Sequence, residues 1–188
     1  GDDTSPRFAI ESLTRFLSRK GKEKDKEMWE KICIGYAAGK KNTGVKDFYM
    51  KQLQLIGGDQ SVEAMKVYLI SKELCDPALA VITAAGGPAA EKILAESLKN
   101  RDLPCATSVM NTLALMNSEI AVNEYITWAA SGDKNVKASA FNALASSGSP
   151  LAYPVLSDAA TEASYRWEQS GATAALLNYA NSIGRKGD

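Results

Sequence analysis

The chain has 188 residues, with 22 basic side chains, 22 acidic side chains and no histidine. This length suffices for one domain with a hydrophobic core or for about five helix pairs. The balanced charge, without a basic stripe among aromatic residues, argues against nucleic-acid binding. The lack of histidine removes the commonest general base and the usual ligands of a catalytic zinc ion. No apolar run is long enough for a transmembrane helix, so we predict no membrane span.

The N-terminal part predicts a helix pair. Residues 5–20 and 25–38 carry apolar side chains at helical spacing, and Pro6 suits the first turn of the first helix. A basic, glycine-containing loop follows at 39–44. We therefore expect residues 1–45 to form an N-terminal helix pair followed by a basic loop.

The rest of the chain, residues 46–188, repeats one pattern about every thirty residues. Apolar residues recur at i, i+3 and i+6 in four segments, and each segment is followed by Gly or Asn. The four segments are Met50–Leu53–Ile56, Leu79–Ile82–Ala85, Met110–Leu113–Met116 and Phe141–Leu144–Ser147. The first column steps by 29, 31 and 31 residues, from 50 to 79 to 110 to 141. The Gly or Asn positions predict helix ends with a left-handed residue.

A second set of apolar columns follows each of these helix ends. Its members are Val62, Met65 and Ile70; Ala90, Ile93 and Leu98; Val122, Tyr125 and Ala130; and Ala152, Val155 and Ala160. Two column sets with nearly the same period predict paired helices that stack on one another.

Two stretches resemble a known family. The run from Asn135 to Leu144 resembles the second helix of a HEAT repeat, and Gly86–Ala90 is similar to HEAT-like modules of secreted bacterial sugar-processing proteins. The resemblance implies an all-α, right-handed α-α superhelix of about five HEAT-like helix pairs, with residues 46–188 as one continuous array.

The resemblance also implies a binding surface, because the second helices of HEAT-like arrays line the concave side. Opposite the apolar columns, these helices carry mostly small or uncharged side chains. The candidate binding residues in this stripe are Lys51, Gln54, Thr83, Thr107, Asn111 and Asn142. Such a surface would let a polypeptide approach closely. The alternative is that the small residues of the stripe simply allow tight helix packing.

A second candidate binding site is the run Tyr165, Arg166 and Trp167, since these residue types are enriched at binding hot spots. It precedes the last helix, where the repeat spacing becomes irregular. The alternative is that Trp167 covers the exposed apolar end of the array.

Carboxylate pairs are the remaining candidates for catalysis, because two carboxyl groups across a cleft can hydrolyse glycosides. The pairs Glu73 with Asp76 and Glu91 with Glu96 are better interpreted as helix caps and solvated side chains. We therefore predict that the chain is not an enzyme, with no catalytic residue, metal ion or cofactor.

The three cysteines form no C-x-x-C motif, which argues against a zinc site and a disulfide framework. Cys33 lies between two isoleucines and is interpreted as a small buried hydrophobe. Cys75 and Cys105 lie 30 residues apart, so stacked repeats could bring them close enough to bridge under oxidation.

The predicted function is a protein-interaction or scaffold module, whose partner is another protein or an adjacent domain of the same polypeptide. The alternative is an accessory domain of a larger exported carbohydrate-processing enzyme. We interpret the start at Gly1-Asp2-Asp3 as the remainder after a leader or tag was removed. A removed leader places the protein in the periplasm or outside the cell; otherwise it is cytoplasmic.

Overall fold

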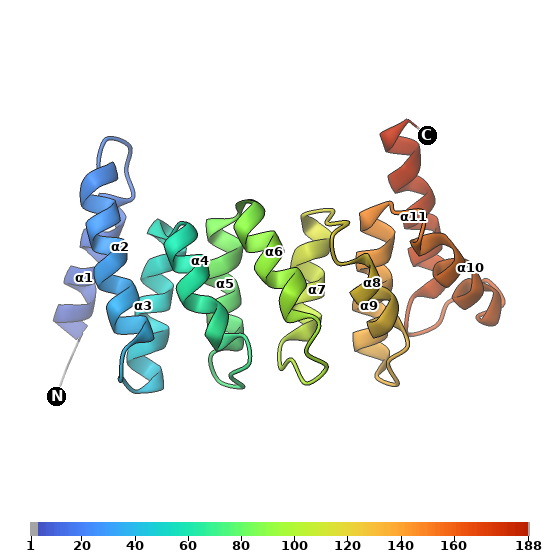
Figure 1. The fold of residues 1–188 in the computed structure, drawn as a ribbon, viewed down its shortest axis with the longest axis horizontal. Helices are drawn as coiled ribbons and strands as arrows, with labels where there is room; N and C mark the ends of the chain where they lie inside the picture. Colours follow the sequence, from blue (N-terminus) through green and yellow to red (C-terminus); the bar gives the residue numbers. More distant parts are fainter. Residues whose placement is uncertain (1–3, 188) are drawn as a thin grey trace. The chain divides into compact units, whose positions relative to one another are not determined.

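The computed structural model describes residues 4–187, and in this range it contains eleven α-helices, one short 3-10 helix and no strand. The expected processed start at residues 1–3 lies outside the described residues. Figure 1 shows the helices in chain order. No helix in the range described is both long enough and apolar enough to cross a membrane.

The chain divides into two compact units, residues 1–93 and 94–188. The first contains α1 (Thr4–Leu17), α2 (Glu23–Ala38), α3 (Thr43–Ile56), α4 (Asp59–Met65), the 3-10 helix η1 (Lys66–Tyr68) and α5 (Cys75–Ala85). Helix α6 (Gly87–Ser97) contains the boundary. The second contains α7 (Ala106–Leu115), α8 (Val122–Ala129), α9 (Lys134–Ser147), α10 (Ala152–Glu162) and α11 (Ala172–Lys186).

Within each unit the helices stack in two rows. In the first unit α3 packs against α5, α2 packs against α4, and α1 lies against α2 and α3. In the second unit α7, α9 and α11 form one row, and α8 and α10 form the other. Alternate helices are therefore neighbours in space, as stacked helix pairs require. The predicted fold class, all-α with helix pairs that stack on one another, is confirmed within each unit.

The predicted apolar columns form most of the core. The buried members in the first unit are Met50, Leu53, Ile56, Val62, Met65, Leu79, Ile82 and Ala90. Those in the second unit are Leu98, Met110, Leu113, Val122, Tyr125, Phe141, Leu144, Ala152 and Ala160. Each unit thus buries the stripe that its helical periodicity predicts.

Two column positions were predicted wrongly. Ile70 is 67% exposed, and the neighbouring Leu69 is buried in its place, because α4 continues as the tighter 3-10 helix and shifts the side-chain register. In the second unit Ala130 is exposed and Ala129 is buried. The helix ends at Ala129, so the helical spacing does not extend to residue 130.

Three of the four predicted helix ends have the expected positive φ: Gly86 at 66°, Asn117 at 52° and Gly148 at 63°. The fourth, Gly57, has a φ of −63°, so no left-handed residue ends α3. Here glycine is needed for close approach: an added Cβ would lie 2.9 Å from Oγ of Ser61 and 2.6 Å from the carbonyl oxygen of Leu53.

Hydrogen bonds also connect residues about one repeat apart. In the first unit the Thr43 hydroxyl donates to Glu73 over 2.9 Å, across 30 positions of sequence. In the second unit the Trp128 indole N–H donates to the carbonyl oxygen of Leu98 over 2.9 Å, again across 30 positions. The repeat period of the sequence is therefore the distance along the chain between residues that touch.

A buried carboxylate makes the densest of these connections. Glu30 on α2 is 7% exposed, and its Oε1 accepts hydrogen bonds from the Gly58 N–H (2.8 Å), the Ser61 N–H (3.2 Å) and the Ser61 hydroxyl (2.7 Å). These donors lie at the N-terminus of α4, where unpaired N–H groups and the helix dipole favour a negative charge. Glu30 thereby ties α4 to α2 and supplies a cap that α4 lacks in its own sequence.

We predict that Glu30→Ala destabilises the protein by about 2–4 kcal/mol, because it leaves buried N–H groups without an acceptor. The thermal midpoint should fall by about 5–10 °C, measured by circular dichroism. Glu30→Gln keeps an acceptor oxygen, so its thermal midpoint should fall less. The control Glu27→Ala, on the exposed face of the same helix, should leave the midpoint nearly unchanged. Equal midpoints for Glu30→Ala and Glu27→Ala would contradict the role of Glu30.

The cysteines are in two chemical states. Cys75 and Cys105 are disulfide-bonded, whereas Cys33 is a buried free thiol. Burial, reinforced by the nearby charge of Glu30, raises the pKa of Cys33 to about 12. Cys33 is therefore protonated and unreactive, as its interpretation as a buried hydrophobe predicts.

We predict that a thiol reagent modifies no cysteine in the native, non-reduced protein. After denaturation without reductant it should modify one thiol per chain, and after reduction all three. Absorbance with Ellman's reagent or the mass of the alkylated chain measures this count. Three reactive thiols in the denatured protein before reduction would contradict the disulfide-bonded state.

Candidate functional site

The stripe residues of the first unit lie on neighbouring helices. Lys51 and Gln54 are on α3 and Thr83 is on α5, and these helices pack against each other. Lys51 and Thr83 are exposed and Gln54 is half-buried. Lys51 pairs with Asp47 over 2.8 Å, one turn earlier on the same helix. A partner at this surface would meet an exposed ion pair, which adds little binding energy by itself.

The stripe residues of the second unit are similarly placed. Thr107 and Asn111 are on α7 and Asn142 is on α9, and these two helices are also packed together. Asn111 and Asn142 are exposed and Thr107 is half-buried. The small residues that continue the stripe, Ala114 and Ala145, are only 4% and 1% exposed. At those two positions the small side chains serve tight helix packing, as the alternative interpretation states.

The run Tyr165, Arg166 and Trp167 forms an exposed loop between α10 and α11. Tyr165 is 61% exposed and Trp167 is 90% exposed. A side chain with that exposure covers no core, so the alternative that Trp167 caps the end of the array is wrong. The buried tyrosine of this region is Tyr179 on α11, whose ring lies 6.3 Å from that of Tyr153.

The loop is held by a local hydrogen-bond network around Glu168. Its carboxylate accepts from the Ser170 N–H (2.6 Å), the Ser170 hydroxyl (2.9 Å) and the Ala172 N–H (2.7 Å). The last of these belongs to the first residue of α11, so the carboxylate caps that helix. Partial burial acts to raise the pKa of Glu168, but the hydrogen bonds from Ala172, Ser170 and Gly171 outweigh it and hold the pKa below the usual range.

The residues before Glu168 are also fixed. Ser164 and Tyr165 both have positive φ, at 52° and 54°, a conformation that non-glycine residues take only where their surroundings impose it. The Tyr165 hydroxyl lies 3.1 Å from that of Thr161, and the carbonyl oxygen of Arg166 accepts from the Thr173 hydroxyl over 3.0 Å. Trp167 is thus presented by an ordered loop.

A shallow pocket of about 200 Å³ adjoins this loop. It is lined by Arg166, Trp167, Glu168, Gly171, Thr173, Ala174 and Leu177. Leu177, on α11, is 64% exposed. Trp167 and Leu177 therefore flank a small apolar hollow with a cation and a carboxylate at its border. We call residues 165–168 with Leu177 the Trp167 site.

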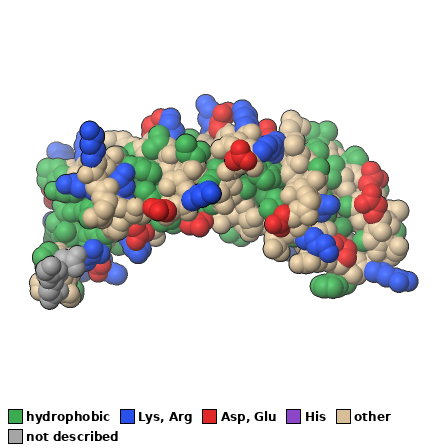
Figure 2. Space-filling model, turned by 90° about the horizontal axis from the view of Figure 1, so that it is seen from below, with side chains coloured by type: hydrophobic (Ala, Val, Ile, Leu, Met, Phe, Trp, Pro, Cys, Tyr) green, Lys and Arg blue, Asp and Glu red, His purple; other side chains and the backbone are tan. Residues whose placement is uncertain are grey.

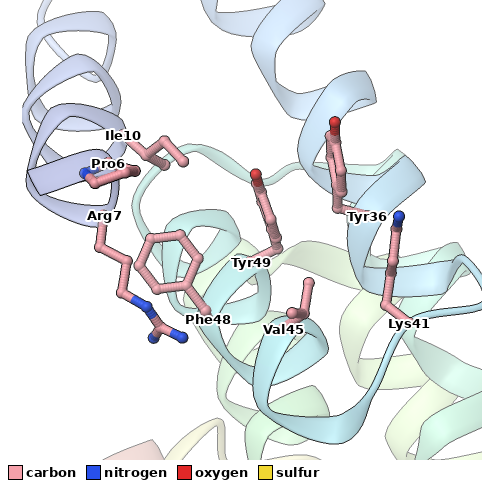
Figure 3. A pocket seen from close by; sticks show the side chains of 8 residues that line it. All are labelled: Pro6, Arg7, Ile10, Tyr36, Lys41, Val45, Phe48 and Tyr49. Atoms are coloured by element: carbon pink, nitrogen blue, oxygen red, sulfur yellow. The ribbon is translucent and has the colours of Figure 1, made fainter. Parts of the chain in front are cut away.

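A larger pocket of about 310 Å³, the aromatic pocket, lies in the first unit between α1, α2 and α3. Figure 3 shows its lining residues: Pro6, Arg7, Ile10, Tyr36, Lys41, Val45, Phe48 and Tyr49. The rings of Tyr36 and Tyr49 are stacked, with centroids 4.5 Å apart and planes 11° apart. Phe48 meets Tyr49 edge-on at 5.3 Å.

Sequence reasoning missed the aromatic pocket. Tyr36 lies inside the second predicted helix, and Phe48 and Tyr49 directly precede Met50, the first residue of the apolar columns. The repeat pattern therefore does not single them out. The available signal was a pair of tyrosines on two helices joined by a short basic loop. Their stacking depends on the angle between α2 and α3, which local sequence does not specify.

No group of three or more acidic, cysteine or histidine side chains suited to a metal ion occurs among the described residues. On the face of the molecule seen in Figure 2, basic and acidic side chains are interspersed rather than gathered by sign. The two pockets described above both depend on aromatic side chains.

We compared the chain with protein families, curated proteins and solved structures. No family model matches the chain, and no curated protein matches it. Among solved structures, human deoxyhypusine hydroxylase in complex with glycerol is similar to it, with a TM-score of 0.44 and 15% sequence identity. The alignment covers 93% of this chain and 80% of the hydroxylase chain.

This likeness corrects one prediction. We predicted from the sequence that the chain is not an enzyme, but this similar solved structure is that of an enzyme. At this degree of similarity the likeness assigns no activity, substrate or cofactor to the chain.

We predict that the Trp167 site loses its order in acid. The folded-state pKa of Glu168 lies below its ordinary value of 4.5, so its stabilisation is complete above that pH and is lost as the pH falls through the folded-state pKa. The protection factor of the Ala172 amide, measured by hydrogen exchange, should fall over this range. In Glu168→Gln it should be lower at neutral pH and independent of pH.

The matched control is Glu162→Gln, at the exposed C-terminal end of α10. It should keep the wild-type pH dependence of Ala172. Glu168→Ala should weaken the start of α11 by about 1 kcal/mol, as loss of a helix cap does. A pH-dependent protection factor in Glu168→Gln would show that another group holds the loop.

Proposed function

We propose that the chain is a protein-interaction module built from HEAT-like helix pairs and that the Trp167 site is its principal contact. The observation that carries this proposal is the 90% exposure of Trp167 on a hydrogen-bonded loop. Leaving so large an apolar side chain in water forgoes about 2 kcal/mol of hydrophobic stabilisation. A partner that covers the indole would recover it.

The order of the loop supports the same proposal. Binding is weakened when a mobile segment must be fixed on association, and a preorganised segment avoids that cost. Glu168 fixes the loop on one side of Trp167, and the bond between Thr173 and Arg166 fixes it on the other. Tyr, Trp and Arg are also the residue types that contribute most at protein interfaces.

The partner is a protein or an adjacent domain of the same polypeptide. We propose that it inserts an apolar side chain into the hollow between Trp167 and Leu177. The stripe residues are proposed as secondary contacts, each in its own unit: Lys51, Gln54 and Thr83 in the first, and Thr107, Asn111 and Asn142 in the second. The sequence-based division into residues 1–45 and 46–188 likewise remains a proposal.

A second candidate function is an accessory role in a larger exported carbohydrate-processing protein. The disulfide-bonded state of Cys75 and Cys105 favours the exported location, because disulfides persist in oxidising compartments such as the periplasm and are rare in the cytosol. The link to sugar processing is supported by the resemblance of Gly86–Ala90 alone.

The test compares partner capture by the full-length chain and by two variants, in extracts of the source cells. Trp167→Ala should reduce retention of the partner by about 30-fold, the effect of losing a hot spot of about 2 kcal/mol. The matched control is Leu115→Ala, which removes another strongly exposed side chain (86%) in the same unit. It should leave retention unchanged.

Thermal midpoints of both variants should equal that of the wild type, because neither side chain contributes to the core. Quantitative mass spectrometry of the retained proteins gives the readout. A partner set that is retained equally by the wild type, Trp167→Ala and Leu115→Ala would contradict the proposal.

A further inference from the structure

The aromatic pocket of the first unit is separate from the Trp167 site, and its chemistry points to a different kind of ligand. Three aromatic residues form one wall: Phe48 is nearly buried (7% exposed), Tyr36 is 41% exposed, and Tyr49 is intermediate. Pro6 and Ile10 of α1 line the opposite side. The volume of about 310 Å³ is at the small end for ligand pockets, which suits a compact molecule.

The charged lining residues are all basic. Arg7 and Lys41 line the pocket, and no Asp or Glu is among the eight lining residues described. The Arg7 guanidinium lies 4.8 Å from the centre of the Phe48 ring, and the Lys41 ammonium lies 5.5 Å from that of Tyr36. Both cations therefore lie against the aromatic wall. The charge of Lys41 would attract an anion and repel a ligand ammonium group.

The tyrosine hydroxyls add hydrogen-bond donors. Figure 3 shows the Tyr36 and Tyr49 rings side by side, with Lys41 beyond Tyr36. The two hydroxyls and the Lys41 ammonium point to the same side. Burial is the main cause that raises the pKa of Tyr49, and electrostatic interaction with Tyr36 and Cys33 raises it further. The Tyr49 hydroxyl is therefore protonated at neutral pH. These groups form one polar edge of a pocket that is otherwise apolar.

The apolar lining decides between two kinds of anion. Pro6, Ile10, Val45 and Phe48 carry no polar side-chain group. A sugar acid has hydroxyl groups around its ring, and several of them would lose their hydrogen bonds to water against this surface. An aromatic or short aliphatic group would instead bury its apolar surface there, while a carboxylate at one end could meet Lys41 and the tyrosine hydroxyls.

We propose that the aromatic pocket binds a small organic acid in which an aromatic or aliphatic group is joined to one carboxylate. The apolar group lies against Phe48, Val45 and Ile10. The carboxylate accepts hydrogen bonds from Lys41 and from the hydroxyls of Tyr36 and Tyr49. Arg7 lies against the Phe48 ring at the opposite border.

The test uses three probes of nearly equal shape: 3-phenylpropionate, 3-phenylpropanamide and 3-phenylpropylammonium. Each is titrated into the full chain, and the amide signals of Val45, Phe48 and Tyr49 are followed by NMR. The anion should shift these signals at the lowest concentration, the amide should bind about tenfold more weakly, and the cation should not bind. Added salt should weaken the anion only.

Variants separate the charge from the rings. Lys41→Gln should weaken binding of the anion about three- to tenfold without changing the affinity for the amide. Tyr36→Phe keeps the stacked ring and should weaken the anion by a smaller factor. The matched control Lys40→Gln removes the neighbouring exposed charge, which does not line the pocket, and should change neither affinity.

Three outcomes would overturn the proposal. The first is equal affinity for the three probes, and the second is an anion affinity that Lys41→Gln leaves unchanged. The third is tighter binding of glucuronate, titrated in the same way as a representative sugar acid, than of 3-phenylpropionate. Because Trp167 takes no part, the titration is informative whether or not the protein-interaction proposal holds. Tyr36→Phe and Lys41→Gln also leave the buried face of Phe48 in place, so loss of folding does not confound the result.

Discussion

Contact between residues about thirty positions apart is the constraint on which this structure depends. A helix of 10 to 16 residues, such as α7 or α2, is marginally stable alone, so its apolar stripe must be covered by another helix. In each unit that cover comes from the equivalent helix of the next pair, as with α3 on α5 and α7 on α9. Fully buried residues such as Met50, Leu53, Met110 and Leu113 are the result.

The polar contacts also join residues about thirty positions apart, and they fix the relative orientation of the helices. Hydrophobic burial is non-directional and would tolerate a helix that slides or rotates. The bond from Trp128 to Leu98 and the three bonds to Glu30 fix individual helices to individual positions one repeat away. A buried carboxylate is costly unless its acceptors are satisfied, so a displaced α4 would lose more than one ordinary hydrogen bond.

Stacking also explains where binding features occur. A helix inside a row has neighbours on both sides, and its apolar residues are used for packing. Helix α1 packs against α2 and α3, and Phe8 remains 70% exposed on it. The aromatic pocket adjoins this helix. In the second unit the Trp167 site precedes α11, the last helix of its row. Both sites thus use aromatic side chains that repeat packing does not consume.

Periodicity predicted the architecture well, because helix burial depends on local spacing that the sequence states directly. Met65, Tyr125 and Leu144 are buried for this reason. The predicted burial of Ile70 was wrong because the chain tightens there into a 3-10 helix, and no residue in the sequence clearly indicates that change. Contacts between side chains on different helices were harder to predict from the sequence. The stacking of Tyr36 on Tyr49 and the network of Glu168 depend on tertiary geometry, and the conclusion that the chain is not an enzyme drew too much from missing residue types.

The most direct test of the stacked arrangement is the environment of the Trp128 indole proton, observed by NMR in the full chain. We expect nuclear Overhauser contacts from this proton to residues around Leu98, together with slow exchange with solvent, because the indole N–H is hydrogen-bonded to the Leu98 carbonyl in a buried setting. An indole proton that exchanges rapidly and shows no contact to residues near position 98 would contradict the account.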